Sequence, residues 1–353
     1  MDKRYFSNKL AEWYEMHKRS LPWRETTDPY RIWLSEVILQ QTRVVQGLPY
    51  YLAFIERFRT VDALAAAPEQ DVLRLWQGLG YYSRARNLHH CAKEIVTRHQ
   101  GQFPTTFAEL KKLRGIGDYT AAAIASISFQ QPVAVVDGNV YRVLARVFGV
   151  DLDIASSEGK KAFADLANEL VSQTRPDLYN QAIMEFGALH CTPRNPKCGD
   201  CIFARSCYAN LKGLQQQLPV KSKQKPVRRR YFYYAVVRRG SSILMNAREG
   251  KDIWHGLYDF ILVEKPGRLG EARMVTEIGN RLGMDIEASE VTISPPYKHI
   301  LTHQHIFSRF IVIEAKGNFG VSGRSPKFYS RKKIAALPKP ALISRFLDDY
   351  KFL

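Results

Sequence analysis

Four of the five cysteines in this 353-residue chain lie within seventeen residues, and this cluster limits the possible folds more than any other feature. Cys191, Cys198, Cys201 and Cys207 follow the spacing C-x6-C-x2-C-x5-C. Soft thiolate ligands select zinc or an iron–sulfur cluster. Zinc loops usually contain two short Cys-x2–4-Cys pairs, whereas here only Cys198 and Cys201 are that close. The spacing therefore favours a four-iron four-sulfur cluster over zinc.

The surroundings of the cysteines support a ligand role. Pro193, Pro196 and Gly199 indicate a loop rather than a core segment, so four unligated buried cysteines are disfavoured. The fifth cysteine, Cys91, is isolated in a helical pattern, and we expect it to pack there as a small hydrophobic residue.

The charge balance indicates a polyanionic partner. The chain has 52 Lys and Arg against 34 Asp and Glu, a formal charge of +18. Nucleic acid is the expected partner, although a ribosome-associated or acidic protein partner fits the charge equally well. No stretch approaches the roughly 18 apolar residues of a membrane helix, and no secretory apolar core follows residues 1–5. We therefore expect a cytoplasmic protein without membrane association.

Length and periodicity indicate two domains. Residues 1–213 have a helical period, and residues 231–353 shift toward strand-like alternation. Residues 214–230 contain six basic residues and no acidic one, and we interpret them as a linker. The net charge is +5 for residues 1–213 and +13 for the remainder. The expected strands are Tyr231–Arg238, Ile243–Ala247, Leu257–Val263 and Phe307–Glu314, with a helix near Glu271–Leu282.

Residues 113–124 contain two glycines, Gly115 and Gly117, followed by strong helix formers. Glycines let backbone N–H groups approach an anion closely, and the N-terminus of the following helix favours negative charge. The pattern therefore predicts a Gly-x-Gly turn between two helices, and the natural ligand of such a turn is a DNA phosphate. A tight turn without a ligand has the same pattern, so the rest of the chain must decide.

An apolar run ends twenty residues after Gly117 in Asp137, Gly138 and Asn139. Asp137 is placed to cap the helix that follows, where the helix dipole favours its ionised form. An isolated aspartate at this position needs no role beyond capping.

In this order, the Gly-x-Gly hairpin, the Asp137 turn and the four-cysteine loop resemble the endonuclease III superfamily of DNA glycosylases, the helix-hairpin-helix group. Three further stretches, Leu-Pro-Trp-Arg at 21–24, Trp-Leu-Ser-Glu-Val-Ile-Leu-Gln-Gln-Thr at 33–42 and Gly-Leu-Gly-Tyr-Tyr at 78–82, resemble the MutY-type adenine DNA glycosylases. That branch carries a Nudix-like domain behind a linker, which matches residues 231–353. The resemblance implies base-excision repair of adenine mispaired with 8-oxoguanine or guanine in double-stranded DNA.

The resemblance also implies a catalytic pair, Glu36 and Asp137. Glu36 lies among apolar residues of a predicted helix, which should raise its pKa and suit it to protonate the leaving purine. Asp137 should stay ionised and stabilise or trap the sugar cation at C1′. Asn139 would orient water or Asp137, and Tyr119 would support the carboxylates. Bifunctional relatives have a lysine where this chain has Tyr119, so we expect a monofunctional glycosylase.

Opening the base pair requires the target nucleotide to leave the stack. The resemblance implies that Gln41 and Tyr81 form the wedge that fills the gap, and that Gly115 and Gly117 hold the DNA backbone. The implied substrate-binding residues are Trp23, Arg24, Leu39, Gln41, Val44, Tyr81, Glu185, Thr302 and His303.

The second domain departs from active Nudix hydrolases, whose metal-binding helix has a Glu-x-x-Glu-Glu string. Residues 271–283 contain only Glu271 and Glu277, so we expect recognition rather than hydrolysis. In the family, a Phe-Ser-His loop of this domain recognises 8-oxoguanine. This chain has Leu301, Thr302 and His303 at the corresponding positions. The hydroxyl and imidazole are kept and the aromatic ring is lost.

Two other functions compete with this interpretation. An endonuclease III-like enzyme for oxidised pyrimidines is disfavoured by Tyr119 and by the extra domain. A catalytically silent DNA-binding module would need neither Glu36 nor Asp137. We expect a monomeric protein that is located in the bacterial cytoplasm and associates with the nucleoid.

Overall fold

The structure, a computed structural model, describes residues 2–222, 226–250, 252–315 and 326–352. The chain forms two compact units: Met1–Ala67 with Arg86–Lys223, and Pro68–Ala85 with Gln224–Leu353. The expected division near residue 213 therefore differs in one respect, because Pro68–Ala85 groups with the C-terminal residues. No helix among the described residues is long and apolar enough to cross a membrane.

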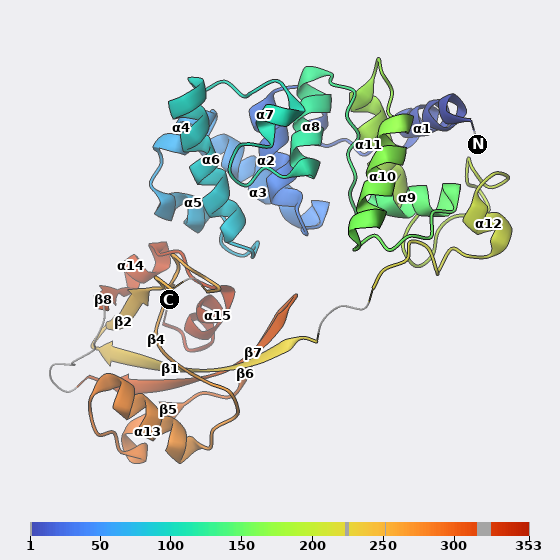
Figure 1. Ribbon diagram of the computed structural model, residues 1–353. Coiled ribbons are helices and arrows are strands. Elements are labelled where there is room, and N and C mark those ends of the chain that lie inside the picture. The colour runs from blue at the N-terminus through green and yellow to red at the C-terminus, as the bar shows by residue number, and fades with distance from the viewer. Residues whose placement is uncertain (1, 223–225, 251, 316–325, 353) are drawn as a thin grey trace. The chain divides into compact units, whose positions relative to one another are not determined.

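The regular elements among the described residues of the first unit are all helices (Figure 1). Helix α6 begins at Ser83, in the second unit, and continues from Arg86 onward in the first. The elements are α1 (Lys3–His17), η1 (Pro22–Arg24), α2 (Pro29–Leu39), α3 (Val44–Arg57), α4 (Val61–Ala66), α6 (Ser83–His99), α7 (Phe107–Leu110), α8 (Asp118–Phe129), α9 (Gly138–Phe148), α10 (Ser157–Leu170), α11 (Pro176–Leu189) and α12 (Tyr208–Lys212).

Helix α11 organises the core of this unit, because it packs on α1, α8 and α9. Four phenylalanines in this core, Phe6, Phe163, Phe186 and Phe203, are fully buried. Burying one such side chain contributes about 2 kcal/mol to folding. Helix α2 packs separately on α8 and α3, which brings its buried face against the helix that follows the predicted hairpin.

The turn between α7 and α8 occupies the place of the predicted hairpin. Gly115 has φ +82°, and a Cβ atom there would lie 2.7 Å from Cβ of Asn87, so this position requires glycine. Gly117 caps α8 with extended backbone and open space around it, so its own geometry does not require glycine.

The second unit contains an eight-stranded sheet. Strands β1 and β7 pair in parallel at its centre, and the other pairings are antiparallel. Its order is β3-β2-β1-β7-β5, with β4 on β1, β6 on β7 and β8 on β2. The elements are α5 (Glu69–Leu75), β1 (Arg228–Arg239), β2 (Ser242–Ala247), β3 (Tyr258–Asp259), β4 (Ile261–Lys265), α13 (Glu271–Leu282), η2 (Ala288–Glu290), β5 (Val291–Ile293), β6 (Tyr297–Leu301), β7 (Gln304–Glu314), β8 (Lys327–Ser330), α14 (Arg331–Ala336) and α15 (Ala341–Asp349).

Helices cover both faces of strand β1, which explains its long run of buried residues. Tyr233, Ala235 and Val237 pack in the cluster that includes α13. On the other face, the rings of Phe310 on β7 and Phe346 on α15 stack with their centroids 3.9 Å apart. Figure 1 shows α13 and α15 on opposite sides of β1 and β7.

The sequence-based boundaries need two corrections in this unit. The run Leu257–Val263 is two strands, because β3 and β4 pair with different neighbours, β2 and β1. The expected linker 214–230 is also too long, because β1 already begins at Arg228. At its other end, Ile154 N–H donates to the carbonyl of Val220 at 3.1 Å, so this part of the expected linker is held by the first unit.

Candidate active site

One pocket in the first unit gathers most of the residues expected to act on a substrate. Residues of η1, α2, α3, α8, α9 and α11 form its wall. The expected residues in this wall are Trp23, Arg24, Glu36, Leu39, Val44, Tyr119, Asp137, Asn139 and Glu185. Residues that lie far apart in the sequence therefore meet in one cavity.

Glu36 lies on α2, where the neighbouring side chains are apolar, and only 8% of its surface is exposed. Burial raises the pKa of Glu36 to about 7, although its hydrogen bond with Tyr119 opposes the rise. The nearby Asp137 carboxylate adds to the rise. A carboxyl group in this state can carry a proton near neutral pH and give it to a substrate.

Asp137 caps α9 and is better solvated by the protein than Glu36. Its carboxylate accepts hydrogen bonds from the backbone N–H of Asn139 and Val140, both at 2.8 Å, and from Asn139 Nδ2 at 2.7 Å. Burial raises the pKa of Asp137, and these hydrogen bonds and Arg142 oppose the rise. The sequence predicts that Asp137 stays ionised; burial, which the sequence does not show, works against this, and the capping hydrogen bonds work for it. The three donors still favour the anion.

A line of hydrogen bonds connects Asp137 to the first cysteine of the loop. Asn139 binds Asp137, and Arg142 Nη2 donates to Asn139 Oδ1 at 2.8 Å. The same guanidinium donates to the carbonyls of Gly187 at 2.8 Å and Cys191 at 2.7 Å. Since Arg142 is buried, these contacts fix the position of Asn139 relative to α11 and the cysteine loop.

Gly187 allows this arrangement, because a Cβ atom there would lie 2.6 Å from Cβ of Asn139. We expect Gly187→Ala to displace Asn139 and to slow the reaction that the resemblance implies for this pocket at least about tenfold in a single-turnover assay, with a stability loss of about 1–3 kcal/mol. Gly267→Ala is the matched control, since nothing lies within 4 Å of the added atom. An unchanged rate for Gly187→Ala would show that Asn139 need not be fixed.

Glu185 lines the pocket and is held between two arginines. Arg19 donates through Nε at 2.8 Å and Nη2 at 2.6 Å, and Arg24 through Nη1 at 2.9 Å and Nη2 at 2.7 Å. Burial alone would raise the pKa of Glu185, but these charge-assisted hydrogen bonds outweigh it and lower the pKa to about 2. Glu185 is therefore a permanent anion that holds two cations at the pocket wall.

Arg19 was not among the residues expected at the site. The only sequence signal for it is its position two residues before the Leu-Pro-Trp-Arg stretch, which carries Arg24. Its partner Glu185 lies 166 residues away, a distance over which no local pattern predicts a contact.

Gln41, an expected wedge residue, follows the end of α2 and has φ +54°. This left-handed conformation is uncommon for a residue other than glycine and often marks functional positions. Gln41 is exposed and lies outside the lining of the pocket.

The other expected wedge residue, Tyr81, belongs to the second unit and also has a positive φ, +48°. Its side chain is 40% exposed. Its hydroxyl lies against that of Thr302, in the turn between β6 and β7. The carbonyl of His303 in the same turn accepts a hydrogen bond from the N–H of Arg228 at 3.2 Å. The second unit thus brings Tyr81, Thr302 and His303 into one region.

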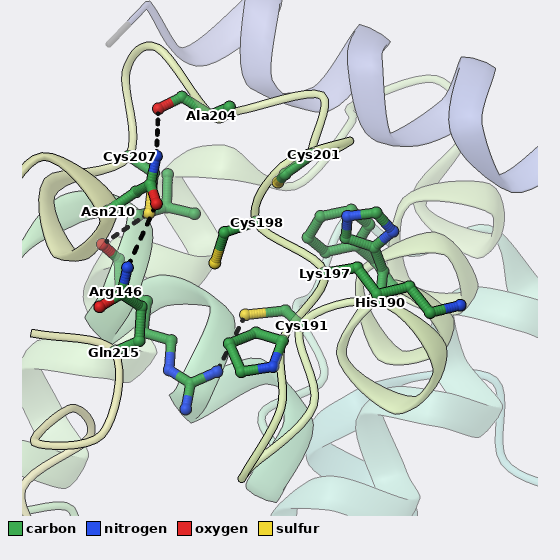
Figure 2. A pocket seen from close by; sticks show the side chains of 13 residues that line it. Arg146, His190, Cys191, Lys197, Cys198, Cys201, Ala204, Cys207, Asn210 and Gln215 are labelled. Carbon is green, nitrogen blue, oxygen red and sulfur yellow. Dashed lines mark hydrogen bonds between the residues drawn. The ribbon is translucent and has the colours of Figure 1, made fainter. Parts of the chain in front are cut away.

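The four clustered cysteines line a second pocket, between the end of α11 and α12 (Figure 2). Figure 2 shows their sulfur atoms around one common space, with the guanidinium of Arg146 beside them. Arg146 Nη1 lies 3.5 Å from Sγ of Cys191 and donates to the carbonyl of Thr192 at 2.7 Å. Four thiols around one space beside a buried cation fit an anionic metal–thiolate cluster. No described set of three or more Cys, His, Asp or Glu side chains converges closely enough for a single metal ion.

In the second unit, the two carboxylates of α13 are engaged in ion pairs. Glu277 lies 2.6 Å from Lys265 Nζ, and Glu271 lies 2.7 Å from Arg309 Nη2. These contacts join α13 to β4 and β7. Glu271 and Glu277 therefore form ion pairs with neighbouring basic side chains and do not form a row of metal ligands.

Three family models match the chain. They describe the HhH-GPD superfamily of base excision DNA repair proteins (residues 34–169), the iron-sulfur binding domain of endonuclease III (191–207) and a NUDIX domain (233–349). The expected helix-hairpin-helix architecture, the Nudix-like second domain and a four-iron four-sulfur cluster are confirmed, and the iron-sulfur family model spans the segment that contains the four clustered cysteines.

Similar proteins cover almost the whole chain. An adenine DNA glycosylase of Buchnera aphidicola subsp. Schizaphis graminum is 30% identical over 98% of this chain and 99% of its own length. An adenine DNA glycosylase of Rattus norvegicus is 32% identical over 91% of this chain and 71% of its own. A solved thermostable thymine-DNA glycosylase is 28% identical with a TM-score of 0.56, over 60% of this chain and 97% of its own. The chain therefore belongs to the adenine DNA glycosylase family, a group of DNA-binding repair enzymes.

Proposed function

We propose that this protein flips adenine out of duplex DNA and hydrolyses its N-glycosidic bond where the adenine is mispaired with 8-oxoguanine or guanine. The observation that carries the proposal is the pair of carboxyl groups in one pocket, Glu36 in apolar surroundings and Asp137 at a helix N-terminus with three donors. The names of the relatives supply the substrate class, and the pocket supplies the chemistry.

Glu36 acts as the general acid. As the bond between C1′ and N9 breaks, its electron pair leaves with the adenine, and the proton of Glu36 passes to the purine. Water then adds to C1′, and its proton returns to the Glu36 carboxylate. Tyr119 lines the same pocket and moderates the rise in the pKa of Glu36. The burial that raises the pKa of Glu36 makes this cycle effective near neutral pH.

Asp137 stabilises the positive charge that develops on the sugar, or traps it transiently at C1′. Asn139 keeps Asp137 oriented through the 2.7 Å hydrogen bond from its Nδ2. Arg142 fixes Asn139 by donating a hydrogen bond to its Oδ1. The orientation of the Asp137 carboxylate toward the pocket is therefore fixed before DNA binds.

The rest of the pocket receives the extruded adenine. Trp23, Leu39 and Val44 supply apolar surface to the pocket, and the Arg24–Glu185 pair supplies polar groups to its wall. Gln41 and Tyr81 enter the duplex where the adenine has left. Their positive φ angles and exposure support this role.

The hairpin and the cysteine loop hold the DNA backbone. Gly115 and Gly117 let the N–H groups at the start of α8 approach a phosphate. Cys191, Cys198, Cys201 and Cys207 would hold the iron–sulfur cluster, which would fix the shape of the cysteine loop. The loop presents Arg194, Lys197 and Arg205 to phosphates.

The second unit recognises the base opposite the adenine and does not hydrolyse nucleotides. Thr302 and His303 supply a hydroxyl and an imidazole in the exposed turn between β6 and β7. The ion pairs of Glu271 and Glu277 support recognition, since a Nudix metal site needs free carboxylates on this helix. Tyr119 in place of lysine supports a monofunctional enzyme.

Single-turnover assays on duplexes with adenine opposite 8-oxoguanine, guanine or thymine test the proposal. We expect adenine release in the order 8-oxoguanine, guanine, thymine, with no strand cleavage and no trapping of the enzyme on DNA by borohydride. The Thr302→Ala, His303→Ala double variant should lose the preference for 8-oxoguanine over guanine. Release of an oxidised pyrimidine, or efficient trapping, would favour the endonuclease III-like function instead.

We further propose that the protein acts on DNA as a monomer and works with the nucleoid. Light scattering of the protein with a short mispaired duplex should give the mass of one chain per duplex. A mass of two chains per duplex would contradict the monomer.

A further inference from the structure

A buried lysine in the second unit has no part in the proposed chemistry. Lys339 follows α14 and is 1% exposed. Its ammonium donates to the carbonyl of Ile334 at 2.5 Å and to that of Leu337 at 2.8 Å. Carbonyls at the end of a helix attract a cation, and this offsets part of the cost of burying the charge. Burial, together with Arg74, lowers the pKa of Lys339 to about 8. The ammonium thus ties the turn at 337–340 to the end of α14.

The peptide groups of Lys339 hold the segment that carries Tyr81. The N–H of Lys339 donates to Gln77 Oε1 at 3.2 Å, and its carbonyl accepts from the hydroxyl of Tyr82 at 3.4 Å. Gln77 Nε2 also donates to Ser344 Oγ on α15 at 3.1 Å. The turn at 337–340 therefore contacts the segment on both sides of Tyr81, at Gln77 and at Tyr82.

Tyr81 needs such support because of its backbone. A positive φ costs a residue other than glycine on the order of 1–3 kcal/mol unless its surroundings impose it. Within the loop, Trp76 Nε1 donates to the carbonyl of Gly80 at 3.0 Å, and the N–H of Gly78 donates to the hydroxyl of Tyr82 at 3.3 Å. These bonds close the loop. The Lys339 contacts join it to the end of α14, and the hydrogen bond from Gln77 to Ser344 joins it to α15.

We propose that Gln77 and Lys339 are positioning residues, which hold the Tyr81 loop ready to enter the duplex beside Thr302. The inference rests on the proposed wedge role of Tyr81 and adds what keeps the wedge in place. Tyr81 and Thr302 then act as one preassembled probe of the base pair, because the hydroxyl groups of the two side chains already meet without DNA.

Hydrogen exchange of the free full-length protein tests the positioning without any activity. In Gln77→Leu and Lys339→Met, we expect the backbone amides of residues 78–84 to exchange at least about tenfold faster, while those of α13 stay within twofold of wild type. Gln77→Glu should restore slow exchange, because it keeps the acceptor for the N–H of Lys339. Lys332→Met is the matched control on the exposed side of α14. Unchanged exchange at residues 78–84, or an equal loss in α13, would overturn the proposal.

Binding to DNA provides the second measurement. Gln77→Leu should raise the Kd for a duplex with adenine opposite 8-oxoguanine about tenfold and leave the Kd for a fully paired duplex within twofold of wild type. For Gln77→Glu, both Kd values should stay close to those of wild type. Equal weakening for both duplexes would overturn the proposal. A wild-type protein that does not release adenine would instead refute the proposed function, and the exchange data would still decide whether Gln77 and Lys339 position the loop.

Discussion

Asp137→Asn should lower the single-turnover rate of adenine release about 10³-fold while leaving the protein folded. The substitution removes the negative charge that faces the sugar cation, and losing a preorganised electrostatic partner of this kind costs about 10²–10³ in rate even when only one hydrogen bond is lost. Asparagine caps a helix as well as aspartate does, so its oxygen can still accept from the N–H groups of Asn139 and Val140. The thermal midpoint should therefore stay close to that of wild type.

Three measurements separate this result from simple damage. The variant should bind the mispaired duplex at least as tightly as wild type, because a negative charge near DNA has been removed. Asp2→Asn is a matched control, since Asp2 caps α1 by accepting from the N–H of Tyr5. Asp137→Ala should show both the loss of rate and a loss of about 1 kcal/mol in stability from the missing cap. A rate for Asp137→Asn within tenfold of wild type would rule out the assigned role.

The features that could be predicted from the sequence are those set by neighbouring residues. The start of α9 follows from the capping chemistry of Asp137, and the cysteine loop follows from ligand spacing. The expected helix Glu271–Leu282 matches α13 at both ends, since Gly270 and Gly283 flank it. Local signals of this kind do not depend on the rest of the fold.

The features that could not be predicted depend on contacts between distant residues. The Arg19–Glu185 pair joins the segment between α1 and η1 to α11, and the hydrogen bond from Arg142 to Cys191 depends on how α9 packs on α11. The positive φ of Tyr81 is imposed by its surroundings, because tyrosine has no intrinsic preference for it. Lys339 is the position whose burial is hardest to predict. A lysine between two prolines indicates an exposed turn, yet the structure buries this side chain.

The pH dependence of the reaction follows from the burial of Glu36. With its pKa raised to about 7, the general acid is protonated below that pH and loses its proton above it. The single-turnover rate of wild type should therefore fall about tenfold for each pH unit above 7. Glu36→Gln should be slower by about 10²–10⁴-fold at pH 7 and should show no such fall. A wild-type rate that stays level to pH 9, or a Glu36→Gln rate within tenfold of wild type, would exclude Glu36 as the acid.

Stability should change with pH in the sense opposite to that of an ion-paired carboxylate. Because the folded-state pKa of Glu36 lies above the ordinary value of 4.5, the folded protein binds this proton more tightly than the unfolded chain does. The group therefore destabilises the fold above pH 7, and the penalty disappears as the pH falls from 7 to 4.5. A difference of this size corresponds to at most about 3 kcal/mol.

Glu36→Gln should accordingly raise the free energy of unfolding relative to wild type at pH 8 and lose most of this advantage by pH 5, as measured by urea unfolding at both values. Glu158→Gln, at an exposed position on α10, controls for the loss of a negative charge and should show no such difference between the two pH values. If Glu36→Gln is less stable than wild type at pH 8, the carboxylate is held by partners rather than penalised by burial, and its role as an acid loses its physical basis. A gain in stability together with a loss of rate is the combination expected of a group that the fold keeps in an unfavourable state for catalysis.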